Sequence, residues 1–250
     1  FALSEFFGKL MFWKLLKGIL SSFYIFLIPS YLLSDTSIST YLNQGMISYD
    51  RSNYSNAIEN WKKASDLGNK EADFLLGFLY DGVLQNDEKA FFYFKKAALS
   101  GHVQAQVNVG ARYEVGEGTE RNNEKAKVWY SKAAYNQDPV GQFRLASLLQ
   151  NIFKKNEESH FWFLKSAELG NPDAHLALAT NFILGKGIKK NLIYAHMSCN
   201  IAAFLYRDVE NIKKTIQLRS ELEVLMNIDE VQNAEQLSRK CIDKKFKERF

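Results

Sequence analysis

The chain contains few of the residues that interrupt helices. Only 3 of its 250 residues are proline, while 14 are glycine. Because proline kinks or ends a helix, its scarcity fits an array built entirely from helices. Apolar residues make up 46% of the chain and charged residues 24%, which is the ordinary balance of a globular protein with ample core material.

The chain also lacks a strong excess of either charge. Its formal net charge is only +4, and three of its lysines lie in the first 35 residues. A nucleic-acid-binding domain normally carries a concentrated basic patch or stripe. The charge balance therefore does not argue for a nucleic-acid partner.

The motifs of common catalytic and cofactor sites are absent from the sequence. There is no phosphate loop of the Gly-x4-Gly-Lys type, no Gly-x-Ser-x-Gly elbow and no Ser-x-x-Lys motif. No two of the 4 histidines lie three or four positions apart, so no pair of histidines could bind zinc on one face of a helix. We therefore predict that the protein is not an enzyme and uses no cofactor or metal.

The 2 cysteines, Cys199 and Cys241, are too few for a disulfide framework. Both lie on predicted helices, where a buried cysteine packs as a small hydrophobic residue. If the protein is exported, the oxidising compartment permits one bridge between them.

A repeated unit dominates the rest of the sequence. The stretch at residues 105–134 reads AQVNVGARYEVGEGTERNNEKAKVWYSKAA, and a shift of 69 residues carries its alanines, glycines and aromatic residues onto similar residues. Successive units start at Ala72, Ala105, Gly141 and Ala174, which are 33, 36 and 33 residues apart. A fixed period in this range predicts a solenoid of stacked units.

Within each unit the apolar residues recur at helical spacing on two segments, which predicts two amphipathic helices. Alanine and glycine occur where helix axes must approach closely, and an aromatic residue fills the space beside them. A Gly-x-Gly turn joins the two helices in the longest units. We expect positive φ angles at Gly118 and Gly187 in these turns, because glycine adopts left-handed backbone angles at little cost.

The pattern A-x-x-x-[LV]-[GA]-x-x-[YF], followed by G-x-G and [DN]-x-x-K-A-x-x-W-[YF]-x-x-A-A, resembles the Sel-one-like repeat, a relative of the tetratricopeptide repeat. The resemblance covers residues 39–203. It implies an all-α, right-handed α-solenoid of about five two-helix repeats that binds other proteins, and many members are bacterial and exported. The chain departs from the pattern at Leu149, which replaces the usual tyrosine, and at Ser198, which stands where Trp129 stands.

The two ends of the chain flank this array. Residues 1–34 are predicted to be a signal peptide or an N-terminal membrane anchor, because Lys14 and Lys17 precede an uncharged run that ends at Ser34. Cleavage would give a periplasmic or secreted protein, retention would anchor it in the inner membrane, and a buried helix is the third alternative. Residues 204–250 are predicted to form helices that cap the solenoid.

The predicted function is a non-catalytic scaffold of the cell envelope, or a secreted one, that binds a protein or peptide on its concave face. In tetratricopeptide-like arrays the first helix of each repeat lines that face. Partner-binding residues are therefore predicted on these helices. They are Phe74, Phe78, Val107, Arg112, Phe143 and Arg144.

An apolar strip beside two arginines suits a peptide that carries acidic residues. We expect charge reversal of Arg112 and Arg144 to leave folding intact. The alternative for Phe74 and Phe143 is packing between repeats. Two other functions stay open: a cell-wall-directed hydrolase or β-lactam-binding enzyme of the same repeat family, and a membrane-anchored assembly factor that retains its apolar segment.

Overall fold

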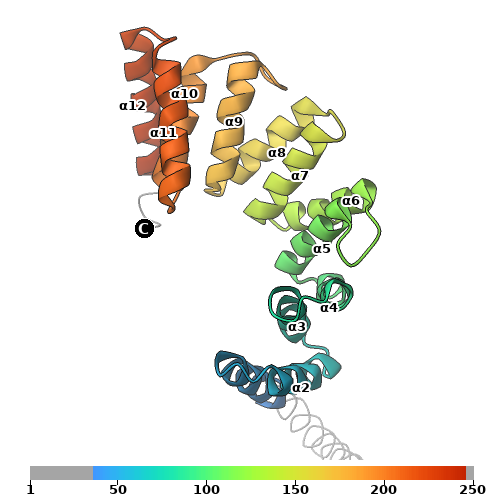
Figure 1. Cartoon of the computed structure of the whole chain (residues 1–250). Helices are drawn as coiled ribbons and strands as arrows, with labels where there is room; N and C mark the ends of the chain where they lie inside the picture. The colour runs from blue at the N-terminus through green and yellow to red at the C-terminus, as the bar shows by residue number, and fades with distance from the viewer. Residues whose placement is uncertain (1–35, 246–250) are drawn as a thin grey trace, which may run out of the picture. The chain divides into compact units, whose positions relative to one another are not determined.

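The computed structural model describes residues 36–245, and all regular structure in this range is helical (Figure 1). The predicted signal peptide or anchor at residues 1–34 lies outside the described residues. In the part that is described, no helix combines the length and apolar composition needed to cross a membrane.

Residues 36–50 form a helix. The later helices are α2 (Tyr54–Asp66), α3 (Lys70–Gly82), α4 (Asp87–Leu99), α5 (Val103–Val115), α6 (Asn123–Tyr135), α7 (Pro139–Asn151), α8 (Asn156–Glu168), α9 (Pro172–Leu184), α10 (Leu192–Leu205), α11 (Val209–Glu223) and α12 (Ile228–Lys245).

The chain divides into two compact units, residues 1–76 and residues 77–250, with the division inside α3. In the first unit the indole of Trp61 is almost completely buried, and its Nε1 donates a hydrogen bond to the Leu42 carbonyl at 3.4 Å. Gly45 leaves room for this ring, because a Cβ atom at that position would overlap it. The first, degenerate repeat therefore has a core of its own.

In the second unit each helix from α4 to α10 packs against the next helix in the sequence. The close approach of two helices depends on small residues opposite aromatic ones. A Cβ atom at Gly110 on α5 would lie 2.6 Å from the ring of Tyr130 on α6, which is fully buried. Gly77 and Phe94 form the same kind of pair. This is the pairing of small and aromatic residues that the repeat pattern predicts.

Polar side chains determine where most of these helices begin. The residue before the helix accepts a hydrogen bond from a backbone N–H in the first turn, which satisfies a donor that the helix itself leaves unpaired. α8 is an exception, because Lys155 precedes it and provides no such bond. The capping residues in the second unit are Asn86, His102, Asn122, Asp138, Asn171, Asn191, Asp208 and Asn227.

The Gly-x-Gly turns have the backbone conformation that the sequence predicts. Gly118 has a φ of 64° and Gly187 a φ of 69°. Gly118 also lies against the start of α4, because a Cβ atom there would be 2.5 Å from the carbonyl carbon of Asp87. Glycine is required at this position for both its φ angle and its lack of a side chain.

Two further helices follow the repeats. α10 continues to Leu205, so the predicted array boundary at residue 203 falls inside a helix. α11 and α12 both pack against α10. The fully buried ring of His196 on α10 lies 3.0 Å from a carboxylate oxygen of Glu223 on α11. These contacts cover the face of α10 that would otherwise be the open end of the array.

Candidate functional site

A groove runs between α7 and α9, the first helices of two consecutive repeats. It consists of two adjoining depressions of about 320 Å³ and 330 Å³, which share Phe143 and Asp173. The fifth and ninth residues of each helix line it, because residues four apart on a helix lie on one face. The side chains that line the groove include Phe143, Arg144, Ser147, Gln150, Asp173, Leu176 and Thr180.

Phe143 forms the apolar floor of this groove. Its ring packs against Phe163 with the centroids 5.7 Å apart, and it contacts the buried cluster that contains Ala146 and Leu178. The ring is only half-buried, so one part stabilises the repeat core and another part remains available to a ligand. Leu176 on α9 adds a second partly exposed apolar side chain.

Charged groups of both signs stand beside this floor. Arg144 is exposed and makes no ion pair within residues 36–245. Asp173 accepts a hydrogen bond from the Tyr206 hydroxyl at 2.7 Å. Burial, and then this bond, raise the pKa of Tyr206 well above its ordinary value, so the phenol stays protonated and keeps donating to Asp173.

Neutral polar groups complete the groove. The Gln150 amide donates to Asn181 at 2.7 Å, and the Thr180 hydroxyl donates to the Leu176 carbonyl at 3.1 Å. Ser147 is partly buried and also lines the groove. Hydroxyl and amide groups of this kind can bond the backbone of a bound peptide.

The structure brings together only some of the predicted partner-binding residues. Phe143 and Arg144 lie in the groove. Val107 on α5 is buried and presents almost no surface, whereas Phe78 on α3 is 51% exposed. Phe74 on α3 is partly buried and belongs to the first compact unit.

The expectation that Arg112 is an exposed groove residue is wrong. Arg112 is 4% exposed, and its guanidinium pairs with Asp81 and with Asp87, the latter at 3.3 Å. The guanidinium also lies over the Phe94 ring, 5.6 Å from its centroid. Its charge is neutralised inside the protein, so Arg112 holds α3, α4 and α5 together and is not available to a ligand.

A sequence signal for the burial of Arg112 does exist. The equivalent residues of other repeats, Leu79 and Leu148, are apolar and buried. By contrast, no local pattern marks Asp173 as a groove residue, because its partner Tyr206 is 33 residues away. That contact becomes visible only when the helices are placed in space.

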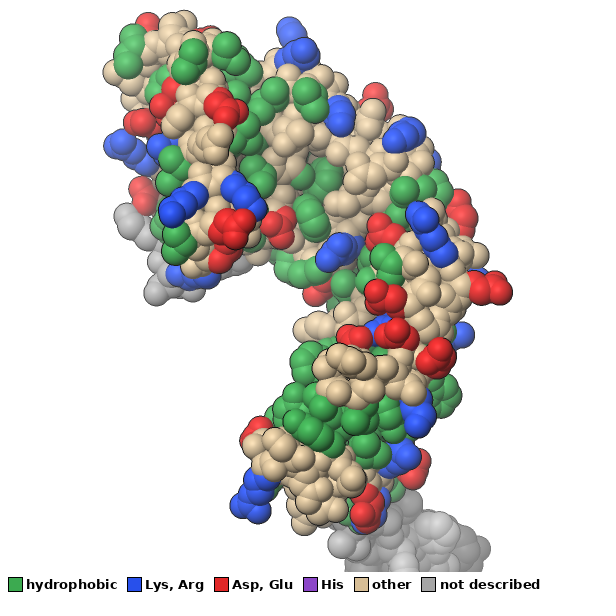
Figure 2. Space-filling view, viewed as in Figure 1, with side chains coloured by type: hydrophobic (Ala, Val, Ile, Leu, Met, Phe, Trp, Pro, Cys, Tyr) green, Lys and Arg blue, Asp and Glu red, His purple; other side chains and the backbone are tan. Residues whose placement is uncertain are grey.

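Within the described residues, no three His, Cys, Asp or Glu side chains cluster in a way that could hold a metal ion. Neither Cys199 nor Cys241 forms a disulfide, and burial raises the pKa of the Cys199 thiol to about 12. On the face shown in Figure 2, lysine and arginine side chains are interspersed with acidic ones.

Comparison with known proteins gives a match to one family model, described as Sel1 repeat. The model matches residues 41–69, 70–102, 103–138, 139–171 and 172–197. The third match, for example, contains all of α5 and α6. These matches confirm the predicted fold, an all-α solenoid of five two-helix repeats.

Two curated proteins illustrate the similarity of sequence. An uncharacterized protein of Neisseria meningitidis is 28% identical over 145 residues, which cover 57% of this chain and 30% of that protein. The chitin synthase regulator SKT5 of Saccharomyces cerevisiae is 33% identical over 125 residues, which cover 48% of this chain and 18% of the regulator. The chain thus spans less than a third of the length of these relatives.

Two solved structures share the fold. A protective antigen of uropathogenic Escherichia coli with an SLR fold has a TM-score of 0.72 and 26% identity, covering 83% of this chain and 46% of the antigen. A Sel1 repeat protein from Oxalobacter formigenes has a TM-score of 0.63 and 25% identity, covering 80% of this chain and 82% of that protein.

Proposed function

The chain belongs to the Sel1 repeat family, and we propose that it is a non-catalytic scaffold that holds a protein or peptide segment in the groove between α7 and α9. Proteins built from Sel1 repeats are generally protein-interaction scaffolds, and the family is typically non-catalytic. The relative SKT5 is named as a regulator of another protein, chitin synthase, which agrees with a role in binding.

The observation that carries the proposal is the unpaired charge of Arg144 beside an apolar floor. Arg112 shows that this chain neutralises an arginine with two carboxylates where the role is structural. Arg144 has no such partner within the described residues, although it stands next to the half-buried ring of Phe143. A cation and an apolar surface side by side are complementary to a segment with an acidic and an apolar side chain.

The proposed ligand is therefore an extended or helical peptide segment. Its apolar side chain packs on Phe143 and Leu176, its acidic side chain pairs with Arg144, and its backbone bonds to groups such as Ser147 and Gln150. Recognition by apolar anchors together with charge complementarity is a recurring mode of peptide binding. The two depressions extend the groove along α7 and α9, which suits a chain segment more than a compact small molecule.

Selection of binders from a displayed library of random peptides tests this proposal without knowledge of the natural partner. Peptides selected on the wild-type protein are expected to be enriched in acidic residues beside an apolar one. Replacement Arg144→Glu should weaken their binding by about tenfold or more, which corresponds to about 1.4 kcal/mol, because an attraction becomes a repulsion.

Arg121→Glu is the matched control, because Arg121 is an exposed arginine outside the groove. This variant should bind the selected peptides as the wild type does. If Arg144→Glu and Arg121→Glu weaken binding equally, or neither does, the peptides bind elsewhere and the groove assignment is wrong.

A further inference from the structure

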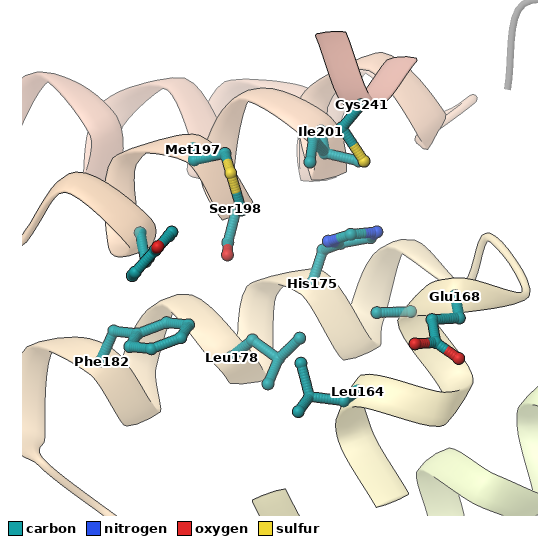
Figure 3. A pocket seen from close by; sticks show the side chains of 11 residues that line it. Leu164, Glu168, His175, Leu178, Phe182, Met197, Ser198, Ile201 and Cys241 are labelled. Atoms are coloured by element: carbon teal, nitrogen blue, oxygen red, sulfur yellow. The ribbon is translucent and has the colours of Figure 1, made fainter. Parts of the chain in front are cut away.

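A second cavity lies on a different face of α9 from the groove. It has a volume of about 280 Å³ and is bounded by α8, α9, α10 and the side chain of Cys241 on α12 (Figure 3). The helix positions that line it on α9 are those of His175, Leu178 and Phe182, whereas Leu176 and Thr180 face the groove. In Figure 3 the Ser198 side chain points from α10 into the space above α9.

The preceding repeat boundary explains why this cavity exists. When the second helices are aligned by their first residues, the seventh residues are Trp129 on α6, Trp162 on α8 and Ser198 on α10. The thirteenth residues are Tyr135 on α6 and Glu168 on α8. Between α6 and α8 the rings of Tyr135 and Trp162 meet edge to face, with centroids 5.4 Å apart.

Between α8 and α10 the same two positions hold a carboxylate and a hydroxyl. Glu168 and Ser198 both line the cavity, and they stand at the helix positions where the aromatic rings of Tyr135 and Trp162 meet one repeat earlier. The cavity is thus the space of an aromatic pair whose two members are absent.

We propose that this cavity binds the indole ring of a tryptophan side chain from a polypeptide partner. This inference rests on the proposed function only because both assume a polypeptide ligand. The groove and the cavity are separate sites on different faces of α9. A polypeptide is favoured as the source because the equivalent boundary is filled by the tryptophan of a chain, Trp162. An apolar cavity of about 150 Å³ is already large enough to bind benzene, so 280 Å³ accommodates a bicyclic ring.

The walls of the cavity match the chemistry of indole. Leu178 and Met197 provide apolar contacts, and thioether sulfur interacts favourably with aromatic rings. The rings of Phe182 and Tyr194, with centroids 5.4 Å apart, offer an aromatic wall like the one that Tyr135 provides to Trp162.

The rim of the cavity is polar and open to solvent. Glu168 is exposed and pairs through one oxygen with Lys165 at 3.1 Å, which leaves the other oxygen to accept the indole N–H. Leu164 is 41% and Tyr194 is 44% exposed, so the entrance is accessible from outside. A side chain attached to another polypeptide can therefore enter from the rim.

Calorimetric titration of the full chain with the blocked peptide Ala-Ala-Trp-Ala-Ala tests the proposal directly. A dissociation constant on the order of 1 mM or lower is expected for one buried bicyclic ring. The peptide Ala-Ala-Leu-Ala-Ala should bind at least about tenfold more weakly. Equal binding of the two peptides, no binding of the first at about 10 mM, or binding of free indole without binding of the peptide overturns the proposal.

The Met197 methyl group locates the binding site without any substitution. Its carbon and proton resonances should shift when the tryptophan peptide is added, whereas those of Met46, in the first compact unit, should not. Peptide-induced shifts that leave Met197 unchanged would place binding elsewhere and overturn the proposal. Arg144→Glu should not alter this binding, so failure here is distinguishable from failure of the proposed groove.

Two substitutions test whether the cavity between α8 and α10 corresponds to the aromatic pair between α6 and α8. Ser198→Trp should fill the cavity and weaken peptide binding by about tenfold or more, while the control Ser131→Trp on α6, outside the cavity, should not. Trp162→Ser should open a second cavity, lower the melting temperature and raise the stoichiometry from one peptide to two. Unchanged binding by Ser198→Trp, or unchanged stoichiometry in Trp162→Ser, contradicts the proposal.

Discussion

At the scale of single residues, burial decides the role of the two arginines that sequence pattern places near the groove. Arg112 is the tenth residue of α5, and the tenth residues of α3 and α7 are the buried Leu79 and Leu148. Arg144 is the sixth residue of α7 and is exposed. The same residue type therefore serves packing at one position and is available for recognition at the other.

Arg112→Glu should destabilise the protein strongly. It places a carboxylate beside Asp81 and Asp87 in a buried site, and it removes the cation that both of them bind. We expect the free energy of unfolding to fall by at least about 2 kcal/mol, measured by urea denaturation. Arg144→Glu is the control and should change it by less than about 0.5 kcal/mol. Equal stability of the two variants would show that the buried ion pairs do not stabilise the fold.

His160 on α8 should make stability depend on pH. The ring is buried against Phe182, its Nδ1 has no hydrogen-bond partner among the described residues, and burial lowers the pKa of His160 below its ordinary 6.5. The unfolded chain then binds the proton more readily than the folded one. The contribution is fully present above pH 6.5 and is lost as the pH falls from 6.5 toward the folded-state pKa.

Substitution His160→Gln should remove this part of the pH dependence. Urea midpoints at about pH 7.5 and about pH 5 should differ less in the variant than in the wild type. The same difference in both proteins would show that protonation of His160 does not cause this loss of stability at low pH.

At the scale of the helix, the repeats begin and end their helices with a few recurring capping residues. An asparagine before α2, α4, α6, α9 and α10 accepts a backbone N–H of the first turn, and left-handed glycines end α5 and α9. α8 is preceded by Lys155, whose side chain provides no cap. The start of α8 is therefore less stabilised than the capped starts of the equivalent helices.

Lys155→Asn should stabilise α8. The backbone angles of Lys155, φ −89° and ψ 73°, are nearly those of Asn53, which caps α2 with φ −87° and ψ 73°. An asparagine at residue 155 can thus form the missing bond, with an expected gain of about 0.5–1 kcal/mol. Thermal unfolding measures it, and Lys155→Ala should show no gain. A melting temperature of Lys155→Asn no higher than that of Lys155→Ala would contradict the prediction.

Gly118→Val should destabilise the turn between α5 and α6. Valine at a φ of 64° is strained, and its Cβ would collide with the backbone of Asp87. The expected loss exceeds about 1–2 kcal/mol, the cost of the left-handed angle alone. Glu117→Val, one residue earlier at an exposed position, should leave the melting temperature nearly unchanged. Similar losses in both variants would show that the effect comes from valine itself and not from the glycine position.

At the scale of the whole molecule, the repeats occupy the middle of the chain. The five family matches span residues 41–197, and α11 and α12 follow them. The chain forms two compact units, each with its own buried aromatic residues, such as Trp61 in the first and Tyr130 in the second. The segment at residues 1–34 lies outside the described residues, and its predicted role in export remains a proposal.

Export is testable with a reporter that is active only outside the cytoplasm. Lys14 and Lys17 precede an uncharged run, which is typical of a signal peptide or an anchor. A fusion of residues 11–50 to the reporter should be active, and a fusion of residues 36–50 should not. Equal activity of the two fusions would exclude the proposal, and N-terminal sequencing of the exported protein would separate cleavage near Ser34 from anchoring.

Much of the fold follows from short-range patterns in the sequence. The repeat period, the two helices of each unit and the left-handed angles at Gly118 and Gly187 were all predicted, because each depends on residues within one turn or one repeat. The general opposition of small and aromatic residues was predicted as well, and the structure shows Gly110 and Tyr130 as one such pair. Phe143 was assigned to the groove face by the same helical geometry.

Only the tertiary structure decided which charged side chains are paired inside the protein and which can contact a ligand. Arg112 is neutralised by Asp81 and Asp87, which are 31 and 25 residues away, and Asp173 is held by Tyr206 at a separation of 33. The cavity lined by Ser198 and Glu168 likewise forms only where α8, α9 and α10 bring their side chains together. Periodicity assigns a residue to a helix face, but burial and pairing depend on which side chains the neighbouring helices bring to that face.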